Sequence, residues 1–137
     1  MDIHFWLYVS RSTISETDTD QAIENIVRVS QARNAALGIT GALVYSDLHF
    51  GQIIEGPPQS MMALKSSILS DPRHCDIRTI SSGKTAMRRF GRWALAYSGA
   101  SVVISRALQR AIRDAAHGHI ESGRELIALM EDVLTPQ

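Results

Sequence analysis

The sequence predicts an α+β fold: a ferredoxin-like βαββαββ mixed sheet with two helices on one face and a C-terminal helical pair on the other. A strand-helix-strand pattern occurs twice before residue 100, and only helical patterns follow Ser101. No repeat or low-complexity linker separates these parts. We therefore expect residues 1–100 to form the sheet domain and residues 101–137 to be an extension of the same domain.

The first strand and the first helix have clear sequence signals. Residues Ile3–Ser10 are aromatic and branched, which predicts a strand, and the polar stretch Arg11–Asp20 predicts a loop. Apolar and small residues then recur at spacings of three and four, which predicts an amphipathic helix that ends at Gly38. The residues of this face are Ala22, Ile23, Ile26, Val27 and Ser30.

A hairpin and a second helix follow in the pattern. Residues 39–45 and 50–55 are short and strand-like, and a four-residue connection joins them. Pro57 and Pro58 suit the start of a helix, which should stop before Asp71-Pro72. Residues 75–81 and 93–98 predict the last two strands, joined by a basic segment.

Two helices are predicted at the C-terminal end. The first is marked by Ile104, Leu108, Ile112 and Ala115, and the second by Leu126, Ile127, Met130 and Val133. We expect the break between them at residues 117–119, where a glycine stands between two histidines.

Composition excludes several classes of protein. The 14 Lys and Arg balance the 14 Asp and Glu, which argues against a nucleic-acid binder. The single Cys75 cannot form an internal disulfide, and no apolar run approaches the roughly 20 residues that span a bilayer. We expect a cytoplasmic protein that binds neither nucleic acid nor membrane.

Signatures of catalysis and metal binding are absent from the sequence. His74-Cys75 and His117-x-His119 could each contribute metal ligands, but a structural zinc usually needs four at tight paired spacings, so we expect no metal site. A small ferredoxin-like enzyme that uses Tyr8 or His49 as an acid or base stays an alternative. The cluster Arg88, Arg89 and Arg92 is either a solvated loop or a contact for an anion.

Gln52 is the residue hardest to explain by packing alone. It lies inside an otherwise apolar strand, three residues before Glu55. A buried amide without partners costs about 1–3 kcal/mol, so Gln52 needs a partner such as the phenol of Tyr8 on a neighbouring strand. The pattern is compatible with a functional polar site and with an ordinary hydrogen bond in the core.

Five motifs in order resemble the BLUF family, flavin-binding sensors of blue light. They are LYVS with Tyr8, RNAALGITG with Asn34, FGQIIEGP with Gln52, DPRH, and RFGRWALA. The resemblance runs from Ile3 to about Ala96, and it implies a ferredoxin-like fold with FAD held between the two helices of the sheet domain.

The resemblance also implies a role for particular residues. Tyr8 matches the photoactive tyrosine, and Gln52 matches the glutamine between that phenol and the flavin. Asn34 matches the asparagine that binds the carbonyl edge of the ring. Ile26 and Ile68 match the residues that flank the two faces of the ring. Asp71, Arg73 and His74 match the segment near the ribityl and phosphate end. Trp93 and Leu95 match the signal relay of the last strand.

Several residues depart from the family pattern. Leu95 replaces a methionine and Ala94 a serine, which weakens the expected exit route of the signal. Gly51 replaces a bulky residue and is expected to loosen the strand. Ser67 replaces a basic residue at the phosphate end, and Lys65 lies too far round the helix to substitute.

The resemblance implies a short, stand-alone blue-light photoreceptor rather than an enzyme, because nothing after Ser101 is long enough for an effector domain. Light would rearrange the hydrogen bonds of Tyr8, Gln52 and FAD, and the change would reach a homodimer interface or a downstream protein partner. The alternative is a photochemically impaired BLUF-like interaction module.

Overall fold

A computed structural model describes residues 2–91, 94–98, 101–115 and 121–134. Five strands form one sheet in the order β4-β1-β3-β2-β5. Neighbouring strands are antiparallel, except that β5 runs parallel to β2. The strands are β1 (Ile3–Ser12), β2 (Thr40–Ser46), β3 (His49–Gly56), β4 (His74–Thr85) and β5 (Ala96–Ser98).

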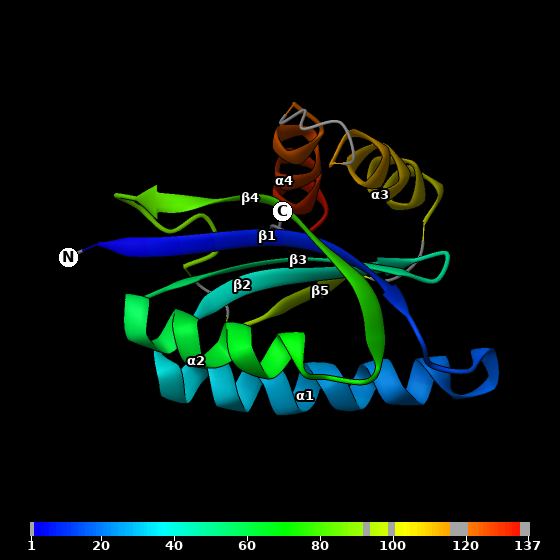
Figure 1. Cartoon of the computed structure of the whole chain (residues 1–137), viewed down its shortest axis with the longest axis horizontal. Coiled ribbons are helices and arrows are strands. Elements are labelled where there is room, and N and C mark those ends of the chain that lie inside the picture. Colours follow the sequence, from blue (N-terminus) through cyan, green and yellow to red (C-terminus); the bar gives the residue numbers. More distant parts are fainter. Residues whose placement is uncertain (1, 92–93, 99–100, 116–120, 135–137) are drawn as a thin grey trace.

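Helices cover both faces of the sheet (Figure 1). Helices α1 (Thr19–Leu37) and α2 (Pro58–Leu69) lie side by side on one face, and a short 3-10 turn, η1 (Glu16–Asp18), precedes α1. Helices α3 (Val102–Ala115) and α4 (Glu121–Leu134) pack on the opposite face. This arrangement confirms the predicted fold, including the placement of the C-terminal helical pair.

The predicted breaks between elements have identifiable backbone causes. Helix α1 ends at Gly38, whose φ of 69° is the left-handed conformation that glycine adopts without steric cost. The β2–β3 connection is shorter than predicted, because strand pairing extends to Ser46 and His49. Only Asp47 and Leu48 form the turn, both with positive φ, as a tight two-residue hairpin requires.

The last two strands differ from the prediction in length. Strand β4 continues past Ser81 to Thr85, because its backbone pairs with β1 as far as Ile3. Backbone pairing does not need apolar side chains, so the polar end of β4 gave no strand signal. Strand β5 contains only residues 96–98. Trp93 and the predicted helix break at residues 117–119 lie outside the described residues.

Alternate residues of the central strands belong to two separate hydrophobic clusters, one on each face of the sheet. Trp6 and Tyr8 of β1 pack with residues of α2 such as Leu64. Leu7 and Val9 point to the other face and pack with the buried residues of α3 and α4. Because side chains alternate along a strand, neighbouring residues of β1 contact different helical layers. None of the described helices is long and apolar enough to cross a membrane.

Candidate functional site

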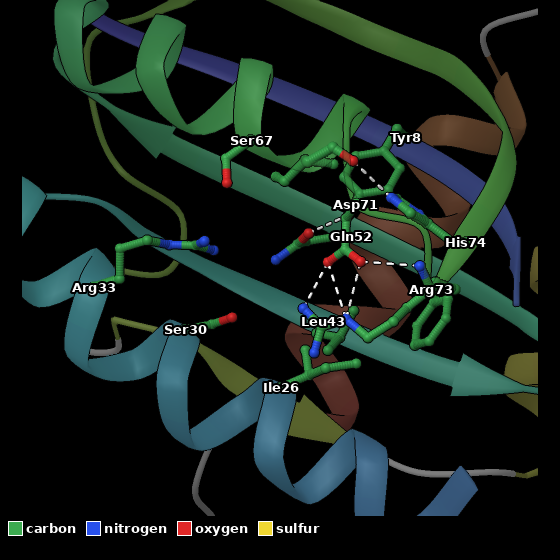
Figure 2. A pocket seen from close by; sticks show the side chains of 12 residues that line it. Tyr8, Ile26, Ser30, Arg33, Leu43, Gln52, Ser67, Asp71, Arg73 and His74 are labelled. Atoms are coloured by element: carbon green, nitrogen blue, oxygen red, sulfur yellow. Dashed lines mark hydrogen bonds and ion pairs between the residues drawn. The ribbon is translucent and has the colours of Figure 1, made fainter. Parts of the chain in front are cut away.

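A pocket opens between α1 and α2, with the sheet as its base (Figure 2). It brings together seven of the eight residues predicted to hold a cofactor, and Asn34 is not among its lining residues. The lining residues are Tyr8, Ile26, Ser30, Arg33, Leu43, Phe50, Gln52, Ser67, Ile68, Asp71, Arg73 and His74.

Tyr8 and Gln52 form the polar centre of the pocket base. They stand directly opposite each other on β1 and β3, and both side chains are buried. The phenol of Tyr8 donates a hydrogen bond to Oε1 of Gln52. Since an amide carries an acceptor at one end and donors at the other, the NH₂ group of Gln52 can donate to a second acceptor.

The surroundings of Tyr8 keep its phenol neutral. Burial raises the pKa of Tyr8, the carboxylate of Asp71 raises it further, and the guanidinium of Arg33 acts in the opposite direction. The ring of Trp6 stacks on the phenol with 4.5 Å between centroids. Lys65 lies over Trp6 at 4.9 Å, away from the pocket lining, as the sequence predicted. Tyr8 is therefore a fixed, protonated donor.

Apolar side chains flank the pocket from both helices. Ile26 comes from α1 and Ile68 from α2. Leu43 and Phe50 belong to β2 and β3. A pocket that combines these apolar side chains with hydrogen-bonding and charged groups suits an organic ligand that has both apolar and polar parts.

A charged pair borders the pocket beyond the C-terminal end of α2. Arg73 donates to the carboxylate of Asp71 from Nε, at 2.9 and 3.1 Å, and from Nη2, at 2.6 Å. This hydrogen bonding from Arg73 lowers the pKa of Asp71 and raises the pKa of Arg73 itself. The pocket can therefore present a fixed cation and a fixed anion to the polar part of a ligand.

His74 connects this border to the sheet. Its Nε2 donates to the carbonyl oxygen of Ile68 at 2.8 Å, because a carbonyl can only accept. Its Nδ1 lies 2.7 Å from the hydroxyl of Ser10 on β1. Both ring nitrogens are thus engaged, which fixes the orientation of the imidazole.

On the α1 side, two buried side-chain polar atoms have no hydrogen-bond partner among the described residues. Asn34 is fully buried and donates from Nδ2 to the carbonyl oxygen of Ala94 at 2.9 Å. Within the described parts of the chain, its Oδ1 has no hydrogen-bond partner, and neither has Nε of the adjacent Arg33. Buried polar atoms are nearly always satisfied, so an unpaired acceptor and donor here indicate a ligand with complementary groups.

Four lining residues were not predicted as part of the site, and Ser67, which was placed at its phosphate end, was not predicted to hold the cofactor. Ser30 and Arg33 lie four and seven residues after Ile26, so they share a helix face with it, and the helical periodicity also points to them. Leu43 and Phe50 accompany Gln52 on paired strands, and Ser67 precedes Ile68. Among these residues Arg33 matters most for the chemistry of the pocket. It brings a positive charge into a pocket in which Ser67 stands in place of the family's basic residue.

The relay residues are placed only in part. Leu95 is 2% exposed and packs in a core cluster with two residues that line the pocket, Leu43 and Phe50. Its carbonyl oxygen accepts a hydrogen bond from Nε2 of Gln31 on α1 at 3.0 Å. Trp93, the other predicted relay residue, lies outside the described residues.

Glu55 has a structural explanation. Its carboxylate is 1% exposed and accepts from the backbone NH groups of Arg89, at 2.9 Å, and Phe90, at 2.6 Å. The hydroxyl of Thr40 also donates to it, at 3.1 Å. This buried carboxylate therefore holds the segment between β4 and β5 against the sheet.

The two described arginines of the basic cluster bind groups within the protein. Arg88 donates to the backbone carbonyls of Gly38, at 2.8 Å, and Glu55, at 3.3 Å. Arg89 pairs with Glu131 of α4 at 3.0 Å. The sequence left two interpretations of the cluster open, a solvated loop and a contact for an anion. The second fits Arg89, and the anion is the carboxylate of Glu131 in the same chain.

His49 does not join Tyr8 in the pocket. It lies at the β2–β3 turn, where its Nδ1 is 2.8 Å from the carbonyl oxygen of Asp47. Of the two residues that the enzyme alternative offered as an acid or base, only Tyr8 lines the pocket.

The chain matches a known family and named relatives. The profile described as "BLUF: Sensors of blue-light using FAD" matches residues 3–96. Photoactivated adenylate cyclase subunit beta of Euglena gracilis is 34% identical over 87 residues, which cover 64% of this chain and 10% of that protein. The blue light- and temperature-regulated antirepressor BluF of Escherichia coli (strain K12) is 32% identical over 84 residues, covering 61% and 21%. The chain thus spans a tenth to a fifth of the length of these relatives.

Solved structures share the whole described architecture. The dark-state structure of BlrB, a BLUF protein, superposes with a TM-score of 0.80 at 31% identity and covers 97% of this chain and 98% of that one. The photo-activated state of BlsA gives a TM-score of 0.79 at 21% identity, a likeness that concerns the fold alone.

Proposed function

Because this chain belongs to the BLUF family, sensors of blue light that use FAD, we propose that it is a photoreceptor driven by rearrangement of the Tyr8–Gln52 hydrogen bond. The observation that carries the proposal is this bond at the base of a pocket that Ile26 and Ile68 flank from the two helices. The match to the photoactivated adenylate cyclase subunit covers only a tenth of that protein. We therefore do not extend the cyclase activity in its name to this chain.

The residues of the pocket fit the parts of FAD. Ile26 of α1 and Ile68 of α2 would contact the two faces of the flavin ring. The unpaired Oδ1 of Asn34 would accept from a ring NH group, and the unpaired Nε of Arg33 would donate to a ring carbonyl. Arg33 would also supply a positive charge to a site in which Ser67 replaces a basic residue.

The polar border would receive the rest of the cofactor. Arg73 and Asp71 are paired there, and His74 is held by Ser10 and Ile68. A guanidinium recognises phosphate oxygens, and a carboxylate accepts from the hydroxyls of a ribityl chain. Binding would therefore replace part of the Asp71–Arg73 pairing by contacts to the ligand.

Bound FAD supplies absorption of blue light and an oxidant in its excited state. Tyr8 is buried, neutral and hydrogen-bonded, so it can lose an electron and release its proton to Oε1 of Gln52. Reversal or tautomerisation of the Gln52 amide would exchange the donor and acceptor that it presents to the ligand. The hydrogen bond to a flavin carbonyl would change, which produces a small red shift.

The output of this switch would be carried by a second molecule. We propose a homodimer or a downstream protein as the receiver, since a small sensor needs a surface through which to report. The competing proposal is a photochemically impaired interaction module. It is favoured by Leu95 and Ala94, which cannot make the hydrogen bonds of the family's usual residues, and by Ser67.

An absorption spectrum of the purified protein separates these functions. We expect a flavin band that shifts to the red under blue light and recovers in darkness. Bound flavin without a shift would favour the interaction module. Colourless protein that cannot be reconstituted with FAD would overturn both functions.

A further inference from the structure

The immediate neighbours of Tyr8 and Gln52 point to the opposite face of the sheet. Leu7 precedes Tyr8 on β1, and Gly51 precedes Gln52 on β3. Because side chains alternate between faces, these two positions face α3 and α4 while Tyr8 and Gln52 line the pocket. Helices α3 and α4 cover the face of the sheet opposite α1 and α2 (Figure 1), so they pack behind the strands that carry Tyr8 and Gln52.

Leucines from both C-terminal helices fill the space beside Gly51. A Cβ atom at this position would lie 2.6 Å from Cδ2 of Leu108 and 3.6 Å from Cδ2 of Leu126. Both leucines are 0% exposed. Gly51 was expected to loosen β3, but the structure shows that side chains of α3 and α4 occupy the volume that a larger residue would take.

A second close contact involves the strand of Tyr8. A Cβ atom at Gly123 of α4 would lie 2.7 Å from Cγ2 of Ile80 and 3.6 Å from Cδ2 of Leu7. Leu7 itself is fully buried. The absence of a side chain at Gly123 therefore lets α4 pack close to β1, one residue before Tyr8.

We propose that Leu108, with Leu126 in ordinary contact beside it, is a positioning residue for Gln52 and acts through the backbone of Gly51. A close-packed interior transmits small displacements instead of absorbing them. The packing of α3 and α4 therefore sets the position of the Gln52 amide. By reciprocity, a rearrangement of Gln52 biases the packing of these helices. The light response rests on the proposed function, whereas the positioning itself also holds without flavin.

The test uses Gly51→Ala, which places a methyl group against Leu108. Gly83→Ala is the matched control, because a Cβ there would lie 3.5 Å from Phe5, an ordinary contact. Leu108→Ala removes the methyl group that opposes the new Cβ. The double variant of Gly51→Ala with Leu108→Ala then measures the coupling between the two positions.

Two measurements are made on each variant. The first is the NMR resonance of the Gln52 side-chain amide in flavin-free protein, and the second is the dark-recovery rate of the FAD-loaded protein. We expect Gly51→Ala to shift the resonance and to change the recovery rate about threefold or more. The double variant should return both values toward those of the unmodified protein, and Gly83→Ala should leave both unchanged.

Additive effects of Gly51→Ala and Leu108→Ala, or a Gly51→Ala protein that matches Gly83→Ala, would overturn the proposal. If Gly51→Ala does not fold, the contact with Gly51 is changed from the helices instead, by Leu108→Val and by Leu126→Val. A Gln52 resonance that does not shift in either variant would also overturn the proposal. Failure of the proposed function would be seen in a different measurement, because the absorption band of FAD-loaded protein would not shift to the red under blue light. The Gln52 amide resonance of flavin-free protein would still show whether Leu108 and Leu126 position Gln52.

Discussion

Tyr8 and Gln52 are cross-strand partners, and the phenol of one donates to the amide oxygen of the other. They are 44 residues apart in the chain, so only the antiparallel pairing of β1 and β3 brings them together. Side chains alternate with a period of two, and a slip of one residue would turn Gln52 toward α3 and α4. The register of this strand pair is thus a condition for the site.

Replacing Tyr8 by Phe should abolish the light-induced red shift while FAD stays bound. The variant keeps the ring and removes the hydroxyl, so Oε1 of Gln52 loses its donor. An unpaired buried acceptor costs about 1–3 kcal/mol, and we expect a loss of stability in that range. Difference absorption and urea unfolding measure the two effects. A normal red shift in this variant would rule out Tyr8 as the electron donor.

The raised pKa of Tyr8 predicts a loss of stability in alkali. The folded protein keeps the Tyr8 phenol protonated above its ordinary pKa of 10.0. The contribution of this phenol to the free energy of unfolding is therefore fully present below about pH 10 and is lost as the pH rises further. Urea unfolding at pH 9 and pH 11 should show a larger decrease for the unmodified protein than for Tyr8→Phe. Equal decreases would mean that Tyr8 does not carry the effect, since Tyr97 is present in both proteins.

Replacing Glu55 by Gln should destabilise the fold by roughly 1.5–3 kcal/mol, the contribution of hydrogen bonds to a charged group. The amide loses the charge that binds the NH groups of Arg89 and Phe90 and places an NH₂ group near donors. Glu24→Gln, on an exposed position of α1, is the control and should be neutral. Equal unfolding midpoints for the two variants would show that the buried carboxylate does not hold this segment.

Replacing Asn34 by Ala should weaken FAD binding about tenfold, the effect of one lost hydrogen bond of about 1.4 kcal/mol. The variant removes the unpaired Oδ1 along with the bond to Ala94. Gln31→Ala is the matched control, because Gln31 binds the next carbonyl, that of Leu95, from the same helix. Titration with FAD compares them. If both variants weaken binding equally, the cause is the lost contact with this segment, and Oδ1 has no separate role.

Replacing Leu95 by Met should change the dark-recovery rate or the light response of the last strand. The substitution preserves volume, so a large loss of stability is not expected. Leu95 packs against Leu43 and Phe50, so a more flexible side chain changes the packing beside the pocket. An unaltered photocycle and response would exclude position 95 as the exit route.

The local signals in the sequence were sufficient for the order of the elements, whereas most of the site residues were predicted from the resemblance to the BLUF family. The stop at Gly38 and the helix start at Pro58 depend on conformational preferences of single residues. Gln52 was conspicuous because a polar residue in an apolar strand needs a partner, and the structure supplies Tyr8. Composition was uninformative here, because the central pair is uncharged.

Other features depend on contacts between distant segments. Nothing near Gly51 shows that leucines 57 and 75 residues later will fill its missing side chain. Arg88 and Arg89 form a simple basic cluster in the sequence, and only the folded chain presents carbonyls to one and Glu131 to the other.

The sequence by itself determined the order of helices and strands and their main boundaries, because periodicity, caps and residue type are local properties. It indicated the residues of the pocket through the resemblance of its motifs to the BLUF family. Tertiary structure decided that Arg33 enters the pocket, that Glu55 is structural and that α3 and α4 pack behind Gln52. These outcomes follow from strand order and close packing, in which each contact depends on where segments distant in the sequence meet.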